Sequence, residues 1–182
     1  MRKALVMPAL LLACAPALAM DYVQAPRAAL AFAGKYQGEV FTGTFPGFRT
    51  RMSFDPANLA GARLDVTIPL ATATTGKRDY DAEMRSQAFL DPGRFPQARY
   101  SADKFRALGG DRYAADGTLR LRGVSRPVTL EFRWTPGPRP MLVGKASVRR
   151  LAFGVGGGDW ADTRLIPDAI AVATVLELRP AP

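Results

Sequence analysis

Residues 113–134 read YAADGTLRLRGVSRPVTLEFRW and carry the clearest structural signal in the chain. From Tyr113 to Leu121, apolar or small residues occupy every second position and mostly polar residues stand between them. The same alternation returns from Val128 to Trp134. A period of two is typical of a β-strand with one buried face. The segment therefore predicts two strands whose apolar faces point into a common core.

A short connection separates these two predicted strands. Gly123–Pro127 is short enough for a hairpin, and Pro127 cannot donate a hydrogen bond to a central ladder. We therefore expect Pro127 at the start of the second strand, and we expect the two strands to be antiparallel neighbours.

Similar patterns recur at near-even spacing, so that we expect about nine strands in all. The remaining candidates are residues 28–33, 39–45, 48–54, 64–70, 97–106, 141–149 and 170–178, with turns at Asp55-Pro56, Gly109-Gly110 and Pro136–Pro140. Residues 77–85 lack the alternation and contain good helix formers, which predicts one or two helical turns. Many short strands at this spacing predict a single all-β domain, either a barrel or a sandwich.

The N-terminus has the order of a secretory signal peptide. Met1-Arg2-Lys3 precedes a mostly apolar run, and Ala17-Leu18-Ala19 provides a small-residue cleavage site. The apolar run is much shorter than the roughly 20 residues that span a bilayer. We expect a signal peptide over residues 1–19, a domain over 20–182 and a periplasmic location. The alternative is a lipoprotein in which Cys14, in Leu11-Leu12-Ala13-Cys14, is acylated.

Composition excludes several kinds of active site from residues 20–182. This segment contains neither histidine nor cysteine, so it lacks thiol nucleophiles, imidazole bases and His/Cys metal sites. We therefore expect that the protein is not an enzyme and that it has no catalytic residue and no metal.

Without Arg2 and Lys3 the chain has 23 basic against 16 acidic residues, a net charge near +7. This charge favours anionic partners such as a membrane surface, while no recognisable motif supports nucleic acid.

The supply of aromatic and small residues allows two kinds of interior. An eight-stranded barrel is just wide enough to be filled by side chains or to hold one small ligand. Ala98, Ala115 and Gly117 lie among aromatic residues on the candidate strands, which would leave space for an apolar chain. An ordinary packed core is the alternative.

Several sequence motifs follow one another in order along the chain. The longest is GTLRLRGVSRPV at residues 117–128. The others, in order, are GTF at 43–45, FDP at 54–56, TTGKRD at 74–79, FLD at 89–91, FP at 95–96, RLAFG at 150–154 and PD at 167–168. Together these motifs resemble the YceI family of exported lipid-binding proteins, and the similarity covers nearly all of residues 20–182.

This resemblance implies a single eight-stranded antiparallel lipocalin-like β-barrel with a short helical insertion. Its lumen would passively bind a polyisoprenoid, a quinone tail or a similar long-chain amphiphile, with no required cofactor and as a monomer or a dimer. The expected wall residues are Phe32, Phe45, Phe54, Leu64, Val66, Tyr100, Leu119, Leu121, Phe132 and Trp134. Arg78 and Arg150 are candidates for headgroup binding or for ordering the rim, and equally for structural pairing with carboxylates such as Asp79.

The chain also departs from the family pattern. It has Gln24-Ala25-Pro26-Arg27 where the family usually shows an Asp-x-x-His-Ser stretch, and Ala152 where an acidic residue is common. The ligand could therefore differ from those of other members. Two alternative functions remain at this point: an enzyme that acts on the bound lipid, and a basic surface module that binds anionic membranes or a protein partner.

Overall fold

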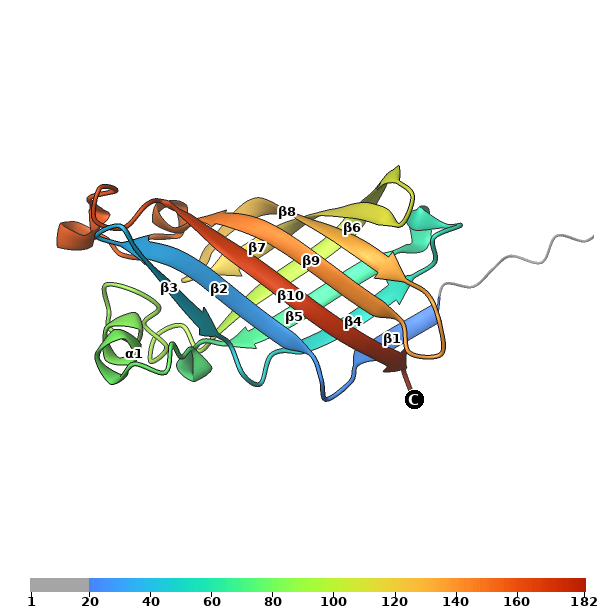
Figure 1. The fold of residues 1–182 in the computed structure, drawn as a ribbon, viewed down its shortest axis with the longest axis horizontal. Helices are drawn as coiled ribbons and strands as arrows, with labels where there is room; N and C mark the ends of the chain where they lie inside the picture. Colours follow the sequence, from blue (N-terminus) through green and yellow to red (C-terminus); the bar gives the residue numbers. More distant parts are fainter. Residues whose placement is uncertain (1–19) are drawn as a thin grey trace, which may run out of the picture.

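The computed structural model describes residues 20–182, so the predicted signal peptide and Cys14 lie outside the described residues. Ten strands form one antiparallel sheet that closes on itself where β1 (Met20–Gln24) pairs with β10 (Ala169–Pro180). Eight of the ten strands make up the closed ring. Figure 1 shows this barrel from the side. The two extra strands, β2 (Ala29–Tyr36) and β3 (Glu39–Thr44), form a hairpin, in which β2 pairs with the first half of β10. The predicted all-β, eight-stranded barrel is confirmed.

The remaining strands follow one another around the ring. They are β4 (Arg49–Phe54), β5 (Arg63–Pro69), β6 (Gln97–Gly109), β7 (Arg112–Leu121), β8 (Val124–Thr135) and β9 (Met141–Arg149). The 3-10 turns are η1 (Leu59–Gly61), η2 (Leu70–Thr72), η3 (Arg150–Phe153) and η4 (Gly158–Ala161). The predicted helical insertion is confirmed as α1 (Arg78–Met84). Sequence patterning missed β1, because a strand of five residues offers too few positions to show alternation.

The hairpin between β7 and β8 is tighter than we expected. Leu121 pairs with Val124, so the turn consists of Arg122 and Gly123, whose φ angles are 50° and 77°. Two consecutive positive φ angles are characteristic of a type I′ turn, which matches the twist of the flanking strands. The prediction that Gly123–Pro127 forms the connection was therefore wrong. Pro127 lies inside β8. The part of β8 that pairs with β9 is Glu131–Thr135, so Pro127 lies outside that pairing.

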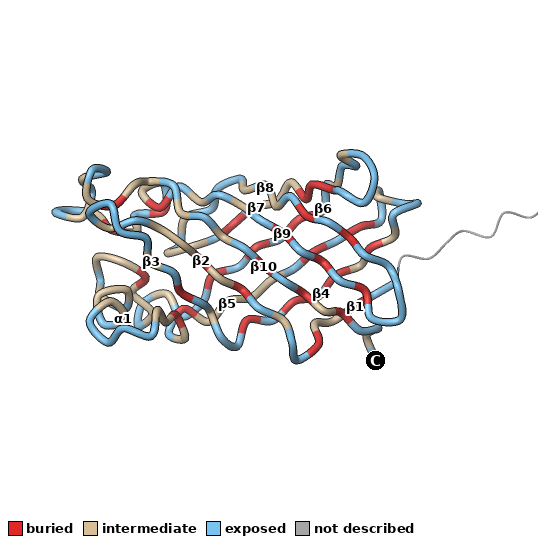
Figure 2. The backbone as a smooth tube through the Cα atoms, viewed as in Figure 1, coloured by how far each residue is buried: buried red, intermediate tan, exposed pale blue. Residues whose placement is uncertain are grey.

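The inward face of the barrel differs between its two ends. Buried and exposed residues alternate along the strands (Figure 2). At the end that holds the β6–β7 turn and the C-terminus, six aromatic side chains fill the interior, which we call the aromatic plug: Tyr22, Phe54, Phe105, Tyr113, Phe132 and Trp134. The ring of Phe54 lies 4.8 Å from that of Trp134 and 5.1 Å from that of Tyr113. This end of the barrel is a packed core.

The other end carries the segments outside the ring. Helix α1, the β2–β3 hairpin and the chain from η3 to η4 gather there (Figure 1). None of the helices in the described part of the chain is long and apolar enough to cross a membrane.

We predict that Phe54→Ala destabilises the protein by about 3–5 kcal/mol, because it removes the central ring of the aromatic plug. Urea unfolding followed by tryptophan fluorescence would measure the loss. Val40→Ala, at a β3 position that is 66% exposed, is the control and should change stability by less than about 0.5 kcal/mol. Equal small losses for both variants would contradict the packing described for the plug.

Candidate ligand-binding cavity

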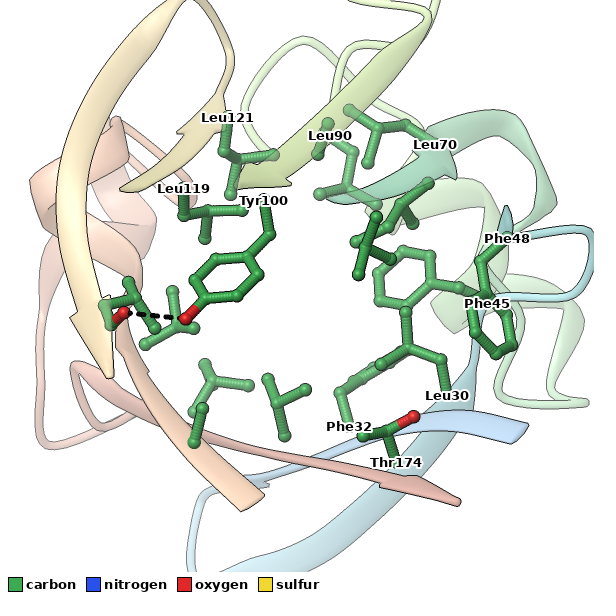
Figure 3. Close-up of a pocket in the computed structure, with 18 of the residues that line it drawn as sticks. Leu30, Phe32, Phe45, Phe48, Leu70, Leu90, Tyr100, Leu119, Leu121 and Thr174 are labelled. Atoms are coloured by element: carbon green, nitrogen blue, oxygen red, sulfur yellow. Dashed lines mark hydrogen bonds between the residues drawn. The ribbon is translucent and has the colours of Figure 1, made fainter. Parts of the chain in front are cut away.

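A cavity of about 230 Å³ occupies the barrel half opposite the aromatic plug. Side chains from β2, β6 and β7 and from the segment between β3 and β4 point into it from several sides (Figure 3). The complete lining is Leu30, Phe32, Phe41, Phe45, Phe48, Thr50, Leu64, Val66, Ile68, Leu70, Met84, Phe89, Leu90, Ala98, Tyr100, Leu119, Leu121, Val128, Leu130, Ala146, Val148, Arg150, Val155, Ile166, Ile170, Val172, Thr174 and Leu176. The volume lies below the usual range for ligand pockets, which is about 300–1,000 Å³.

Most of the expected wall residues lie on this cavity. They are Phe32, Phe45, Leu64, Val66, Tyr100, Leu119 and Leu121. Phe54, Phe132 and Trp134 do not: they point inward as predicted but belong to the aromatic plug. The alternation identified their face correctly, but it carries no information on their height along the barrel axis.

The sequence reasoning missed two groups of lining residues. Ile170 and Val172 lie on the inward face of β10, a strand that the sequence predicts. The alternation along this strand could therefore have identified both residues as part of the lining. Met84, Phe89 and Ile166 come from irregular segments or the end of a short helix, where no periodicity marks an inward residue.

Tyr100 lines the cavity, and hydrogen bonds fix the position of its ring. Its hydroxyl donates to the backbone oxygens of Ala115, at 2.8 Å, and Val128, at 3.2 Å, so the ring reaches across β7 to β8 (Figure 3). Gly117 makes this possible, because a Cβ atom there would lie 2.6 Å from the Cζ atom of Tyr100. Burial raises the pKa of the Tyr100 phenol above its usual value, so the group stays neutral.

Arg150 lies at the mouth end and is 3% exposed. Its Nε and two Nη atoms donate to five backbone oxygens at 2.6–3.2 Å, those of Val155, Gly156, Trp160, Ile166 and Pro167. A guanidinium has five N–H donors, so none remains for a ligand headgroup. Burial lowers the pKa of Arg150, and the nearby Asp168 opposes that shift. The geometry therefore gives Arg150 the role of ordering the rim.

The other candidate arginine lies elsewhere. Arg78 is the first residue of α1, is exposed and is not part of the cavity lining. The structure therefore does not bring Arg78 and Arg150 together as a shared headgroup site.

A set of half-buried aromatic side chains connects the segments around the mouth. These mouth aromatics are Tyr36, Phe41, Tyr80, Phe89 and Trp160, whose neighbouring ring centroids lie 5.4–6.4 Å apart. They come from the β2–β3 hairpin, α1, the segment after α1 and η4. Contacts between rings at such distances contribute about 0.5–1.5 kcal/mol each beyond area burial.

Asp81 holds α1 at the mouth. Its carboxylate accepts hydrogen bonds from the Thr74 hydroxyl at 2.6 Å, the Thr75 amide at 2.6 Å and the Thr75 hydroxyl at 2.8 Å. These hydrogen bonds lower the pKa of Asp81, and the bond from Thr74 contributes most.

No cluster of three or more Asp, Glu, His or Cys residues that could hold a metal ion occurs within residues 20–182.

Arg150→Met should destabilise the protein by about 3 kcal/mol or more, because it leaves five carbonyl oxygens of the rim without their donor. Limited proteolysis should also show faster cleavage between η3 and β10. Arg149→Met is the control: that side chain is 80% exposed and pairs with Asp168, so its loss should cost less than about 1 kcal/mol. Equal stability of the two variants would contradict the rim-ordering role of Arg150.

Stability in acid should depend on Asp81. Its folded pKa is lower than the 3.8 of an unperturbed carboxyl, so its contribution is present above that value and is lost as the pH falls through the folded pKa. Asp81→Asn cannot titrate at this position. The melting temperature of the wild type should therefore fall more steeply than that of Asp81→Asn below about pH 4. Parallel curves for the two proteins would contradict this role.

Comparisons with known proteins support the fold and place the chain among relatives. The structure of BcnA from Burkholderia cenocepacia superposes with a TM-score of 0.79 at 26% identity, covering 82% of this chain and 95% of that one. A polyisoprenoid binding domain from Saccharophagus degradans gives a TM-score of 0.69 at 16% identity, covering 90% and 99%. At that identity the second likeness concerns the fold alone.

Sequence relatives and a family model agree with this likeness. A UPF0312 protein from Yersinia pestis is 32% identical over 131 residues, which cover 70% of this chain and 68% of the relative. The model of the YceI-like domain matches residues 22–178, from β1 to near the end of β10. The motifs identified in the sequence, the closed barrel and this match lead to one conclusion: the chain belongs to the YceI-like domain family.

Proposed function

We propose that this protein is a periplasmic lipid carrier that sequesters a polyisoprenoid, a quinone tail or a similar long-chain amphiphile without transforming it. The observation that carries the proposal is the cavity, in which all but four of the lining side chains are apolar. A closed barrel with such a lining shields an apolar chain from water on all sides.

Burial of the chain accounts for the binding energy. Each buried methylene contributes about 0.8 kcal/mol, or roughly 4 kcal/mol for a five-carbon isoprene unit. Association costs about 4–15 kcal/mol, so several such units are needed for stable binding. The cavity is small for a long tail. We therefore expect the ligand to extend from the cavity past the mouth aromatics.

Three further observations support the proposed ligand class, the periplasmic location and the absence of a reaction on the bound lipid. The solved polyisoprenoid binding domain shares this fold. The residue order at positions 1–19 is that of an export signal. Among the lining residues only Tyr100 and Arg150 are ionisable, and both donate their hydrogens to backbone oxygens.

Native mass spectrometry of protein from the periplasmic fraction, followed by organic extraction, tests the proposal directly. We expect one long-chain isoprenoid or quinone-like molecule for each barrel, because the cavity has room for a single chain. Protein that carries no lipid and also fails to take one up after purification would rule out the carrier function.

A substitution that fills the cavity should weaken binding without unfolding the protein. Ala146→Phe adds a ring at a lining position of β9, where the cavity gives it room. We expect at least about a tenfold loss in affinity for the extracted lipid, measured by displacement of a fluorescent probe. Ser147→Phe adds the same ring at the exposed neighbouring position and should bind as the wild type does. Unchanged affinity in Ala146→Phe would place the ligand elsewhere.

A further inference from the structure

The outer surface of the barrel carries its positive charge unevenly. Strands β4, β5, β6 and β7 hold eight arginine and lysine residues against three aspartates. Residues 20–182 as a whole hold 23 basic against 16 acidic residues, so these four strands carry +5 of a net charge of +7. The four strands are consecutive neighbours in the sheet and form one continuous part of the wall. Most of the net positive charge therefore lies on one side of the barrel.

Three arginines on these strands lie at one level of the wall. Arg49 in β4 pairs with Thr67 in β5, which pairs in turn with Arg99 in β6. Arg99 then pairs with Arg120 in β7. All three arginine side chains are exposed, and we call Arg49, Arg99 and Arg120 the arginine row. Side chains at directly opposite positions have Cβ atoms about 4.5–5.5 Å apart, and like charges there are destabilising. Arg99 and Arg120 therefore repel each other.

No carboxylate forms an ion pair with the arginine row. The six ion pairs found within residues 20–182 use other arginines, namely Arg106, Arg112, Arg133, Arg139, Arg149 and Arg164. The aspartates of the four strands, Asp65, Asp103 and Asp116, all lie on the side of the row that faces the aromatic plug. Asp65 accepts from the Ser101 hydroxyl at 2.7 Å, and Asp116 accepts from Arg106 at 2.6 Å. The charge of the row is thus left for a partner outside the chain.

The arginine row lies on the outside of the cavity wall, close to the mouth. The residues on either side of Arg99 in β6 and of Arg120 in β7 line the cavity: Ala98, Tyr100, Leu119 and Leu121. Because successive residues of a strand face opposite sides of the sheet, the arginines between them face outward. Arg120 also precedes the β7–β8 turn by two residues, at the end of the barrel opposite the aromatic plug. A partner bound to the row would therefore lie beside the mouth.

We propose that the arginine row docks the barrel on a membrane that contains anionic phospholipids. A phosphate bound by Arg99 and Arg120 together offsets their repulsion, and the planar guanidinium fork matches the oxygens of a phosphate. A membrane presents many phosphates on one surface, which suits three cations spread over four strands. The choice of a membrane over an acidic protein rests on the proposed carrier function, because a lipid carrier exchanges its cargo with a membrane.

Co-sedimentation of the delipidated protein with vesicles tests the inference. One set of vesicles contains phosphatidylcholine alone, and the other also contains the anionic phosphatidylglycerol. We expect the wild type to bind the anionic vesicles at least about tenfold more tightly, because each cation near an anionic surface adds to the attraction. At about 0.5 M salt this preference should largely disappear, because screening shortens the range of the attraction.

A triple substitution removes the row itself. The row variant, Arg49→Gln/Arg99→Gln/Arg120→Gln, should bind anionic vesicles at least about tenfold more weakly than the wild type. Its binding to phosphatidylcholine vesicles should stay unchanged. It should melt no lower than the wild type, because the substitutions remove the repulsion between Arg99 and Arg120. The melting temperature thus shows that weaker binding does not come from unfolding.

A matched variant removes the same charge from the other side of the barrel. Arg27→Gln/Lys145→Gln/Arg179→Gln replaces three exposed cations that form no ion pair with a described residue. They lie in the β1–β2 connection, β9 and β10, and the last two strands are opposite β5 and β6 in the ring. This variant should bind anionic vesicles within about threefold of the wild type, because cations far from the docked surface are screened.

Three outcomes would overturn the inference. Equal losses in the two triple variants would show that net charge alone drives binding. Equal affinity of the wild type for both kinds of vesicle would remove the role of anionic lipid. Binding to neither kind would leave an acidic protein as the partner of the row. The carrier function is tested separately: protein that carries no lipid but binds anionic vesicles through the row would refute that function alone.

Discussion

Closure of the sheet between β1 and β10 is the constraint on which the remaining structure depends. Only three residue pairs make this contact, from Tyr22–Pro180 to Gln24–Leu178. Closure gives the first and last strands a partner, so the ring has no open edge there and one face of every strand is enclosed. Inside a closed ring, the size of each inward side chain decides whether a given level is filled or hollow.

The two halves of the barrel use this freedom differently. The aromatic plug fills one half, with Phe54 in contact with four other rings. In the other half Tyr100 reaches across Gly117 toward β8, and the lining is mostly aliphatic. One end thus supplies packing stability, while the other keeps the space that a ligand requires. A small barrel can bind an apolar chain because these two demands are met at different levels along its axis.

Arg150 is a buried cation at an apolar mouth, and its hydrogen bonds to the rim explain its burial. The chain between η3 and β10 is irregular, so its carbonyl oxygens cannot pair within a sheet. Arg150 satisfies five of them at once. This leaves the lumen without a free positive charge, even though the protein as a whole is strongly basic. The lining of the lumen is therefore almost entirely apolar, which agrees with burial of an apolar chain.

The sequence by itself determined every strand except β1, the inward faces of those strands, the presence of a hairpin near Gly123, the helical insertion and the family, because a strand's alternation and a motif are local properties. Only the tertiary structure decided which inward residues meet the cavity. Phe54 and Phe45 look alike in the sequence, yet one lies in the plug and the other on the lining, because height along the axis depends on register and tilt across the ring. The carbonyl oxygens that accept from Arg150 likewise could not be identified from the sequence, because only folding brings residues such as Ile166 to its guanidinium.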